Sequence, residues 1–252
     1  MSFNTPAKLG FSLLLACTLN SGVAVSAPLS IWSAEGYTQF ANDDGHVGPG
    51  GGGQSFDAEY FYYKLEGSIL SIGLQTGFDV EDGHLLHTDG RDYYSGDLAL
   101  SFDGSNSAYE YGVDFGLYTE GYYNGTVDMG TGTGTDSAGL YRDVNWSNDI
   151  YTGHHVSDPF ALDAGTLIAD GLTGNEASSG AVDGSYYRIV SLDLNTLGVS
   201  YDNPLEIDAH WTMSCGNDVI DVQFEVSEPT TLPLLGLGLL ALALGRRKMR
   251  RR

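Results

Sequence analysis

Apolar and polar residues that alternate at every second position are the feature of this sequence that most constrains its fold. The segment 219–226 reads VIDVQFEV, so every second side chain from Ile220 onward is apolar and those between are acidic or amide-bearing. Successive side chains of a β-strand point to opposite faces. The segment therefore predicts a strand with one buried face and one solvated face.

Further segments have strand character, and short turn-forming sequences separate them. They are rich in aromatic and aliphatic residues and lie at 60–65, 68–75, 97–102, 109–115, 187–194 and 205–213. Glu66-Gly67 between the first two predicts a hairpin. The body shows no long amphipathic helix, and its many glycines fit strands joined by tight turns. We predict an all-β fold, an antiparallel and jelly-roll-like β-sandwich over residues 28–226.

The last residues, 227–252, have a different composition in three consecutive parts. Ser227, Glu228 and Pro229 form a short polar motif, and the stretch from Pro229 to Gly245 carries no charge and includes eight leucines. Seventeen helical residues span about 25 Å, which local thinning of a bilayer accommodates. Basic residues then end the chain: Arg246, Arg247, Lys248, Arg250, Arg251 and Arg252. We predict one transmembrane helix with its basic end in the cytoplasm and the preceding domain outside.

This tail resembles the PEP-CTERM sorting signal of Gram-negative bacteria, in which Pro-Glu-Pro precedes a Leu/Gly-rich helix and a terminal Arg cluster. Glu228 and Pro229 match that motif, whereas Ser227 stands where the family has its first proline. The resemblance implies recognition by exosortase, a membrane enzyme that cuts near the motif and releases or transfers the body. It also implies a setting of exopolysaccharide and biofilm matrix. An ordinary tail anchor is the alternative interpretation.

Residues 1–27 have the features of a secretory signal peptide. A short apolar core at 9–16 is followed by small residues, and 25–27 offers a small-residue cleavage site directly before a proline. The segment 22–24 is an alternative cleavage site of the same kind. A lipobox ending at Cys17 is a further alternative, which would leave a lipid anchor at that residue.

The body between the two termini is strongly acidic. It contains four basic residues against 32 acidic ones, a net charge near −28 compared with −22 for the whole chain. This charge argues against nucleic acid and anionic lipid surfaces as partners. It fits a highly soluble extracellular domain, a high-salt habitat or binding of divalent cations. Cys215 is the only cysteine of the body, and we expect it to be a small buried hydrophobe.

Acidic turns are the candidates for a metal site. Calcium takes six to eight oxygen ligands, which clustered carboxylates on turns can supply. The weak candidate ligands are Asp79, Glu81, Asp82 and Asp89. Their spacing does not fit an EF-hand, so calcium is possible but no cofactor is required. A zinc site at His84 and His87 is not expected, because two residues three apart on a strand or loop do not converge.

The sequence carries no recognisable catalytic motif, and we expect a protein that is not an enzyme. It has no Gly-x-Ser-x-Gly elbow, although a glycosidase pair of carboxylates is an open alternative. Aromatic doublets suggest a platform for sugar rings, because adjacent strand residues face opposite sides and one member of each pair should be exposed. They are Tyr60–Tyr63, Tyr93-Tyr94, Tyr122-Tyr123 and Tyr186-Tyr187.

One further segment, 210–218, reads HWTMSCGND and is similar to a segment in the bodies of some PEP-CTERM proteins. From its residues we expect a strand, a turn and then the final strand. The glycine-rich stretches 48–53 and 125–139 are interpreted as spacers. We thus expect an exported protein with a structural or adhesive role in exopolysaccharide or biofilm. Its expected partners are exosortase, exopolysaccharide and, before processing, the inner membrane; a calcium-dependent carbohydrate-binding module is the alternative.

Overall fold

The computed structural model describes residues 26–88, 90, 92–104, 108–115, 138–147, 158–170, 178–182, 184–201 and 204–226. Within these ranges most residues lie in antiparallel strands, and the all-β prediction is confirmed. Of the predicted signal peptide, residues 1–27, only Ser26 and Ala27 are among the described residues, and the predicted C-terminal helix lies wholly outside them. The described helices are all too short or too polar to cross a membrane.

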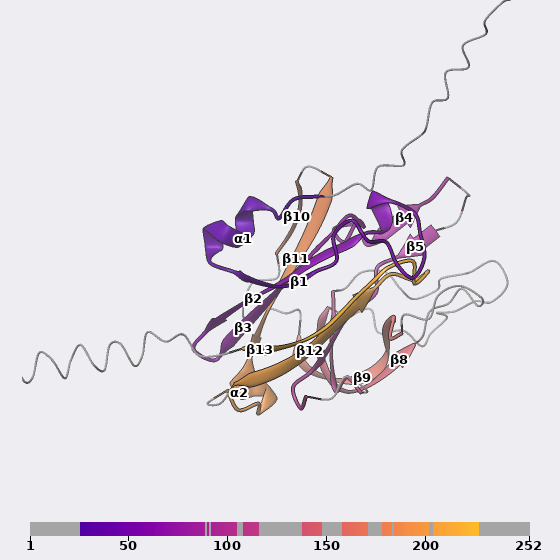
Figure 1. Cartoon of the computed structure of the whole chain (residues 1–252). Helices are drawn as coiled ribbons and strands as arrows, with labels where there is room; N and C mark the ends of the chain where they lie inside the picture. Colours follow the sequence, from indigo (N-terminus) through magenta and orange to yellow (C-terminus); the bar gives the residue numbers. More distant parts are fainter. Residues whose placement is uncertain are drawn as a thin grey trace, which may run out of the picture.

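Two sheets form the two layers of the domain (Figure 1). The first has the order β1-β2-β3-β11-β10, with the bounds β1 Thr38–Asn42, β2 Ala58–Glu66, β3 Ile69–Thr76, β10 Ser178–Val182 and β11 Ser185–Asp193. The second has the order β13-β12-β6-β7-β8-β9, with the bounds β6 Leu98–Ser101, β7 Tyr111–Asp114, β8 Gly139–Ser147, β9 Ala161–Asp170, β12 Leu205–Thr212 and β13 Val219–Val226.

Short elements complete the described chain at the rims of the sheets. They are α1 Ser30–Glu35, the 3-10 turn η1 Gln54–Phe56, the hairpin strands β4 His84–Leu86 and β5 Asp92–Tyr94, and α2 Leu194–Leu197. Helix α1 ends at Gly36, whose positive φ of 80° lets its N–H return to the Trp32 carbonyl. A residue with a Cβ would be strained there.

The strand order corrects the jelly-roll detail of the prediction. Each sheet combines a meander of consecutive strands, β1-β2-β3 or β6-β7-β8-β9, with one later hairpin added at the first or last strand of that meander. A jelly roll instead interleaves its strands through two Greek keys. The difference follows from the short turns, such as Gly67-Ser68 between β2 and β3, which favour pairing of neighbours in the sequence.

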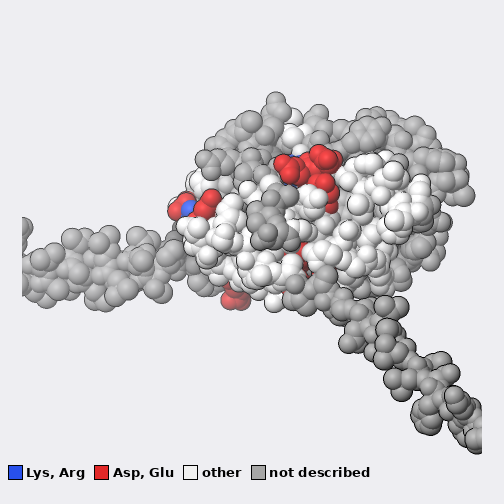
Figure 2. Space-filling model, turned by 90° about the horizontal axis from the view of Figure 1, so that it is seen from above, with Lys and Arg blue, Asp and Glu red and all other residues white. Residues whose placement is uncertain are grey.

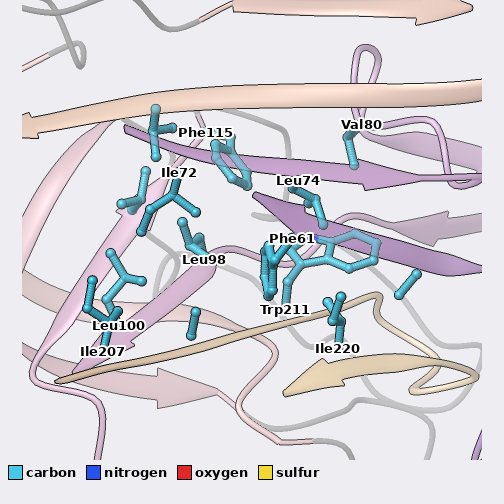
Figure 3. Close-up of a cluster of buried hydrophobic side chains, with 14 of the residues drawn as sticks. Phe61, Ile72, Leu74, Val80, Leu98, Leu100, Phe115, Ile207, Trp211 and Ile220 are labelled. Carbon is cyan, nitrogen blue, oxygen red and sulfur yellow. The ribbon is translucent and has the colours of Figure 1, made fainter. Parts of the chain in front are cut away.

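The core lies between the two sheets and consists of the residues that alternate at period two. Ile72 and Leu74 of β3 face Leu98 and Leu100 of β6, and Trp211 of β12 belongs to the same cluster, beside Phe61 (Figure 3). All six side chains are at most 1% exposed. Burial of each such side chain stabilises the fold by roughly 1.5–3 kcal/mol. The Trp211 indole N–H donates to the Gly96 carbonyl at 3.1 Å, so its one polar atom is also satisfied.

The edge strands β1 and β13 close one side of the sandwich. Phe40 of β1 stacks on Phe224 of β13 with ring centroids 3.7 Å apart, and Tyr63 of β2 packs against the same ring. This aromatic contact ties the last strand of the chain to the opposite sheet.

Candidate functional site

The acidic turn that was the first calcium candidate is held by its own hydrogen bonds. Asp79 Oδ1 accepts from the backbone N–H groups of Glu81 and Asp82 at 3.0 and 2.9 Å. Arg188 of β11 donates through Nε to the Val80 carbonyl at 2.6 Å and through Nη2 to the Glu81 carbonyl at 3.3 Å. The Asp79 carboxylate therefore organises the turn, and Arg188 fastens the turn to the first sheet.

No group of three or more metal-ligating side chains that could hold an ion is present among the described residues. Asp89 lies outside them, so the calcium hypothesis rests on sequence alone. His84 lies near Tyr94, with ring centroids 5.2 Å apart, whereas His87 lies against Phe56 at 5.5 Å. The two histidines therefore pack against different aromatic rings.

The predicted exposure of one member of each tyrosine doublet is wrong for Tyr60-Phe61 of β2, whereas Tyr63 of the next doublet is partly exposed. Phe61 is buried in the core, and Tyr60 and Tyr62 on the opposite face are only 4% and 3% exposed. Helix α1 lies over that face (Figure 1), and its Trp32 stacks on Tyr62 with a centroid distance of 4.4 Å. The outer face of the first sheet is thus covered by the chain's own N-terminal segment. Tyr122 and Tyr123 lie outside the described residues.

A buried polar network holds this N-terminal segment on the sheet. Gln75 of β3 accepts through Oε1 from the Leu29 N–H and the Trp32 indole N–H, at 3.0 and 2.7 Å. Its Nε2 donates to the Ala27 carbonyl at 3.0 Å and to Glu59 Oε2 at 2.7 Å. All four hydrogen-bonding positions of the Gln75 amide are thereby used, although the side chain is fully buried.

Glu59 is the charged member of the network. A bulge in β2 between Ala58 and Tyr60 interrupts the alternation of side chains, and Glu59 lies at this bulge. Its Oε1 accepts from Gln54 and Ser185 at 2.6 and 2.8 Å. Burial raises the pKa of the Glu59 carboxyl, and these hydrogen bonds partly oppose that shift.

Asp218, the last residue of the segment 210–218, makes its longest-range contacts. Its Oδ1 accepts from the N–H groups of Gly48 and Val219, both at 3.0 Å, and its Oδ2 accepts from the Ala58 N–H at 2.6 Å. Burial outweighs these three bonds and raises the pKa of Asp218 to about 7. The expected strand, turn and final strand are confirmed. The segment also carries a carboxylate that joins the start of β2 to the glycine-rich loop.

The glycine-rich loop 48–53 is therefore more than a spacer. The Gly50 N–H donates to the Asn217 carbonyl at 2.7 Å, and the Asn217 side-chain amide donates to the Gly51 carbonyl. A Cβ on Gly50 would overlap the backbone of Asn217. Cys215 beside this turn is buried, as expected.

A second group of polar residues lies on the outer face of β12 and β13. Asp221 accepts from the Tyr109 hydroxyl at 3.1 Å, and its Oδ2 lies 3.9 Å from His210 Nδ1, a contact that lowers the Asp221 pKa. Asp208 on β12 is fully buried, and neither of its carboxylate oxygens has a hydrogen-bond partner. Burial, followed by the charges of Asp221 and other neighbouring acids, raises its pKa.

These features define an acidic, all-β domain whose last strand runs directly into the C-terminal tail. A family model described as the PEP-CTERM protein-sorting motif matches residues 225–251. The chain therefore carries a PEP-CTERM sorting motif, which implies a secreted protein that exosortase processes from a membrane-anchored precursor. Comparisons with curated proteins and with solved structures found no match. The motif residues Ser227, Glu228 and Pro229 and the basic cluster lie outside the described residues.

Proposed function

We propose that this protein is a structural or adhesive component of the cell surface or extracellular matrix, in exopolysaccharide or biofilm. The observation that carries the proposal is the position of the sorting motif. The match begins at residue 225, and β13 ends at Val226, so the motif starts within the last strand. The whole β-sandwich is consequently the cargo that exosortase handles.

The fold determines which end of the β-sandwich holds Val226, after which the tail begins. Val226 pairs with Leu205 at one end of the second sheet. At the other end of β13, Asp218 bonds to Ala58 at the start of β2, so β2 and β13 run in similar directions in the two sheets. The β2–β3 turn consequently lies at the same end as the tail. The glycine-rich loop lies at the opposite end, beside Asp218.

Charge supports a matrix role. Figure 2 shows a surface on which acidic side chains outnumber basic ones, in agreement with the net charge of the chain. Like-charged domains stay soluble and apart until a specific attachment brings them together. A signal that delivers the domain to a surface supplies such an attachment.

The test is deletion of Glu228 to Arg252, followed by fractionation of cells into soluble, membrane, surface and matrix material. The wild type is expected at the surface or in the matrix, and the truncated protein in the soluble fraction. A control variant with only Ser227→Ala keeps the family residues Glu228 and Pro229 and should partition like the wild type. Identical partitioning of wild-type and truncated protein would refute the sorting role.

Two further experiments distinguish a matrix component from a carbohydrate-binding module and from an enzyme. Binding to a glycan array that a chelator abolishes would favour the calcium-dependent carbohydrate-binding module over a passive matrix component. The described members of the doublets that could serve such binding are partly exposed: Tyr63, Tyr94, Tyr186 and Tyr187. Turnover on a polysaccharide panel would contradict the proposed non-catalytic role.

A further inference from the structure

Residues 26–36, which we name the N-terminal strap, are part of the folded domain from their first residue. The Ser26 backbone N–H and its hydroxyl both donate to Asp44 Oδ1 at 2.8 Å. The Tyr60 hydroxyl lies 3.2 Å from the Ser26 carbonyl and 3.0 Å from Asp44 Oδ2. The Ala27 carbonyl accepts from Gln75 Nε2. Together, Ser26 and Ala27 thus form hydrogen bonds with Asp44, Tyr60 and Gln75, which belong to three different segments of the body.

The rest of the strap is anchored by burial. Leu29 and Trp32 are 7% and 2% exposed and pack on Tyr60, Tyr62 and Ile189. Trp32 lies directly over Gly73, where any Cβ would overlap its ring. The strap therefore occupies a site that β2, β3 and β11 form for it. Ser26 and Ala27, its first two residues, also contact β2 and β3 through Tyr60 and Gln75.

The two candidate cleavage sites have different consequences for these bonds. A cut after Ala27 removes both Ser26 donors from Asp44 and the carbonyl that Gln75 Nε2 reaches, and it puts Pro28 at the new N-terminus. A cut after Ala24 also follows a small residue and leaves every one of these bonds intact. We infer that signal peptidase cleaves between Ala24 and Val25, so that Ser26 and Ala27 remain in the mature protein as the start of its fold.

The charges around Ser26 support the same position. Asp43, Asp44, Asp57 and Glu59 lie close enough to affect one another, and Asp57 Oδ1 is buried without a hydrogen-bond partner. Burial, ahead of the neighbouring acids, raises the pKa of Asp57 to about 6. Cleavage after Ala24 creates an α-ammonium group one residue before the Ser26 amide. The positive charge is thus one residue from Ser26, whose N–H and hydroxyl both donate to Asp44.

Other positive charges of the described body are used elsewhere. Lys64 pairs with Glu66, Arg142 pairs with Asp143, and Arg188 donates to the acidic turn. His46 lowers the pKa of Asp43 by its charge, but burial outweighs it. Cleavage after Ala24 thus supplies a positively charged α-ammonium group close in sequence to Ser26, which bonds to the acidic residue Asp44.

The test is N-terminal sequencing and intact mass of the exported protein, purified from the producing cells. The expected first residue is Val25. A first residue of Pro28, or a lipidated Cys17, would overturn the inference, and starts at Val25 and Pro28 differ by the mass of the segment 25–27. The result does not depend on the matrix role, since an unprocessed Met1 start would instead contradict the signal peptide itself.

Two matched variants provide a second measurement. Leucine at the residue before the cut is too large for a small-residue cleavage site. Ala24→Leu should therefore retain the signal peptide, whereas Ala27→Leu should be processed normally, because the Ala27 side chain is exposed and only its backbone carbonyl bonds to Gln75. The reverse pattern, or a Pro28 start in Ala24→Leu at the wild-type yield, would show that the cut follows Ala27.

Discussion

Replacing Gln75 by leucine should release the N-terminal strap and destabilise the domain. The change keeps the volume of the side chain but removes four hydrogen bonds. The Ala27 carbonyl can turn to water because Ala27 is exposed. The Leu29 N–H, the Trp32 indole N–H and one oxygen of Glu59 lose a partner in a buried place. At about 1–1.5 kcal/mol for each such group, the expected loss is about 3–5 kcal/mol.

The assay is denaturant unfolding of the exported protein, with tryptophan fluorescence as a second readout. Release of the strap moves Trp32 from its stack on Tyr62 into water, so the native emission of Gln75→Leu should shift to longer wavelength. Gln39→Leu is the matched control, because Gln39 on β1 is exposed and should change stability by no more than about 0.5 kcal/mol. Equal stability of the two variants would refute the role assigned to the network.

Three further predictions concern other parts of the domain. Gly73→Ala should lower stability by about 1–3 kcal/mol because the new Cβ overlaps Trp32, while Gly51→Ala, with open space around its Cβ, should be neutral when both are compared by thermal unfolding. The pKa of Asp218 is about 7 in the folded protein against an ordinary value of 3.8, so the folded state binds the proton more tightly than the unfolded state. The free energy of unfolding should therefore fall as the pH rises from about 4 to 7. Asp218→Asn should flatten this slope in denaturation experiments at a series of pH values. Asp79→Ala should cost about 1 kcal/mol equally with and without a chelator; a loss seen only in the presence of calcium would point to a bound ion.

The strands with regular alternation were predictable from the sequence. The segments 60–65, 68–75 and 205–213 correspond to β2, β3 and β12, and 219–226 is β13 to the residue. In each of them the apolar residues that enter the core recur at every second position, as Leu70, Ile72 and Leu74 do in β3, although tertiary contacts bury the opposite face of β2 and β3 as well. A simple rule about side-chain direction was enough in these cases.

Strands β1 and β8 were not predicted, because a bulge within each of them breaks the pattern that identifies a strand. In β8 the register with β9 shifts around Arg142 to Asn145, and Asp143 has a positive φ of 52°. Strand β1 likewise contains a register shift between Gln39 and Ala41. Alternation fails at these points although hydrogen bonding between the strands continues.

The N-terminal strap and Asp218 depend on contacts between residues far apart in the sequence. Helix α1 has only six residues, and its position follows from Trp32 fitting over Gly73 and bonding to Gln75. Burial of Asp218 follows from donors at Gly48 and Ala58, more than a hundred residues earlier. The sequence identified the segment 210–218, but it could not indicate which backbone groups the carboxylate would meet.

The direct continuation of β13 into the tail has a mechanical consequence. A pull directed along the axis of β13 would load its eight residue pairs with β12, from Leu205↔Val226 to Thr212↔Val219, in shear. Shear shares the force among all rungs of the ladder, whereas peeling would break them one at a time. The Phe40–Phe224 stack adds resistance from the other layer. A domain attached through β13 can therefore bear a force along this strand without the strand detaching from the second sheet.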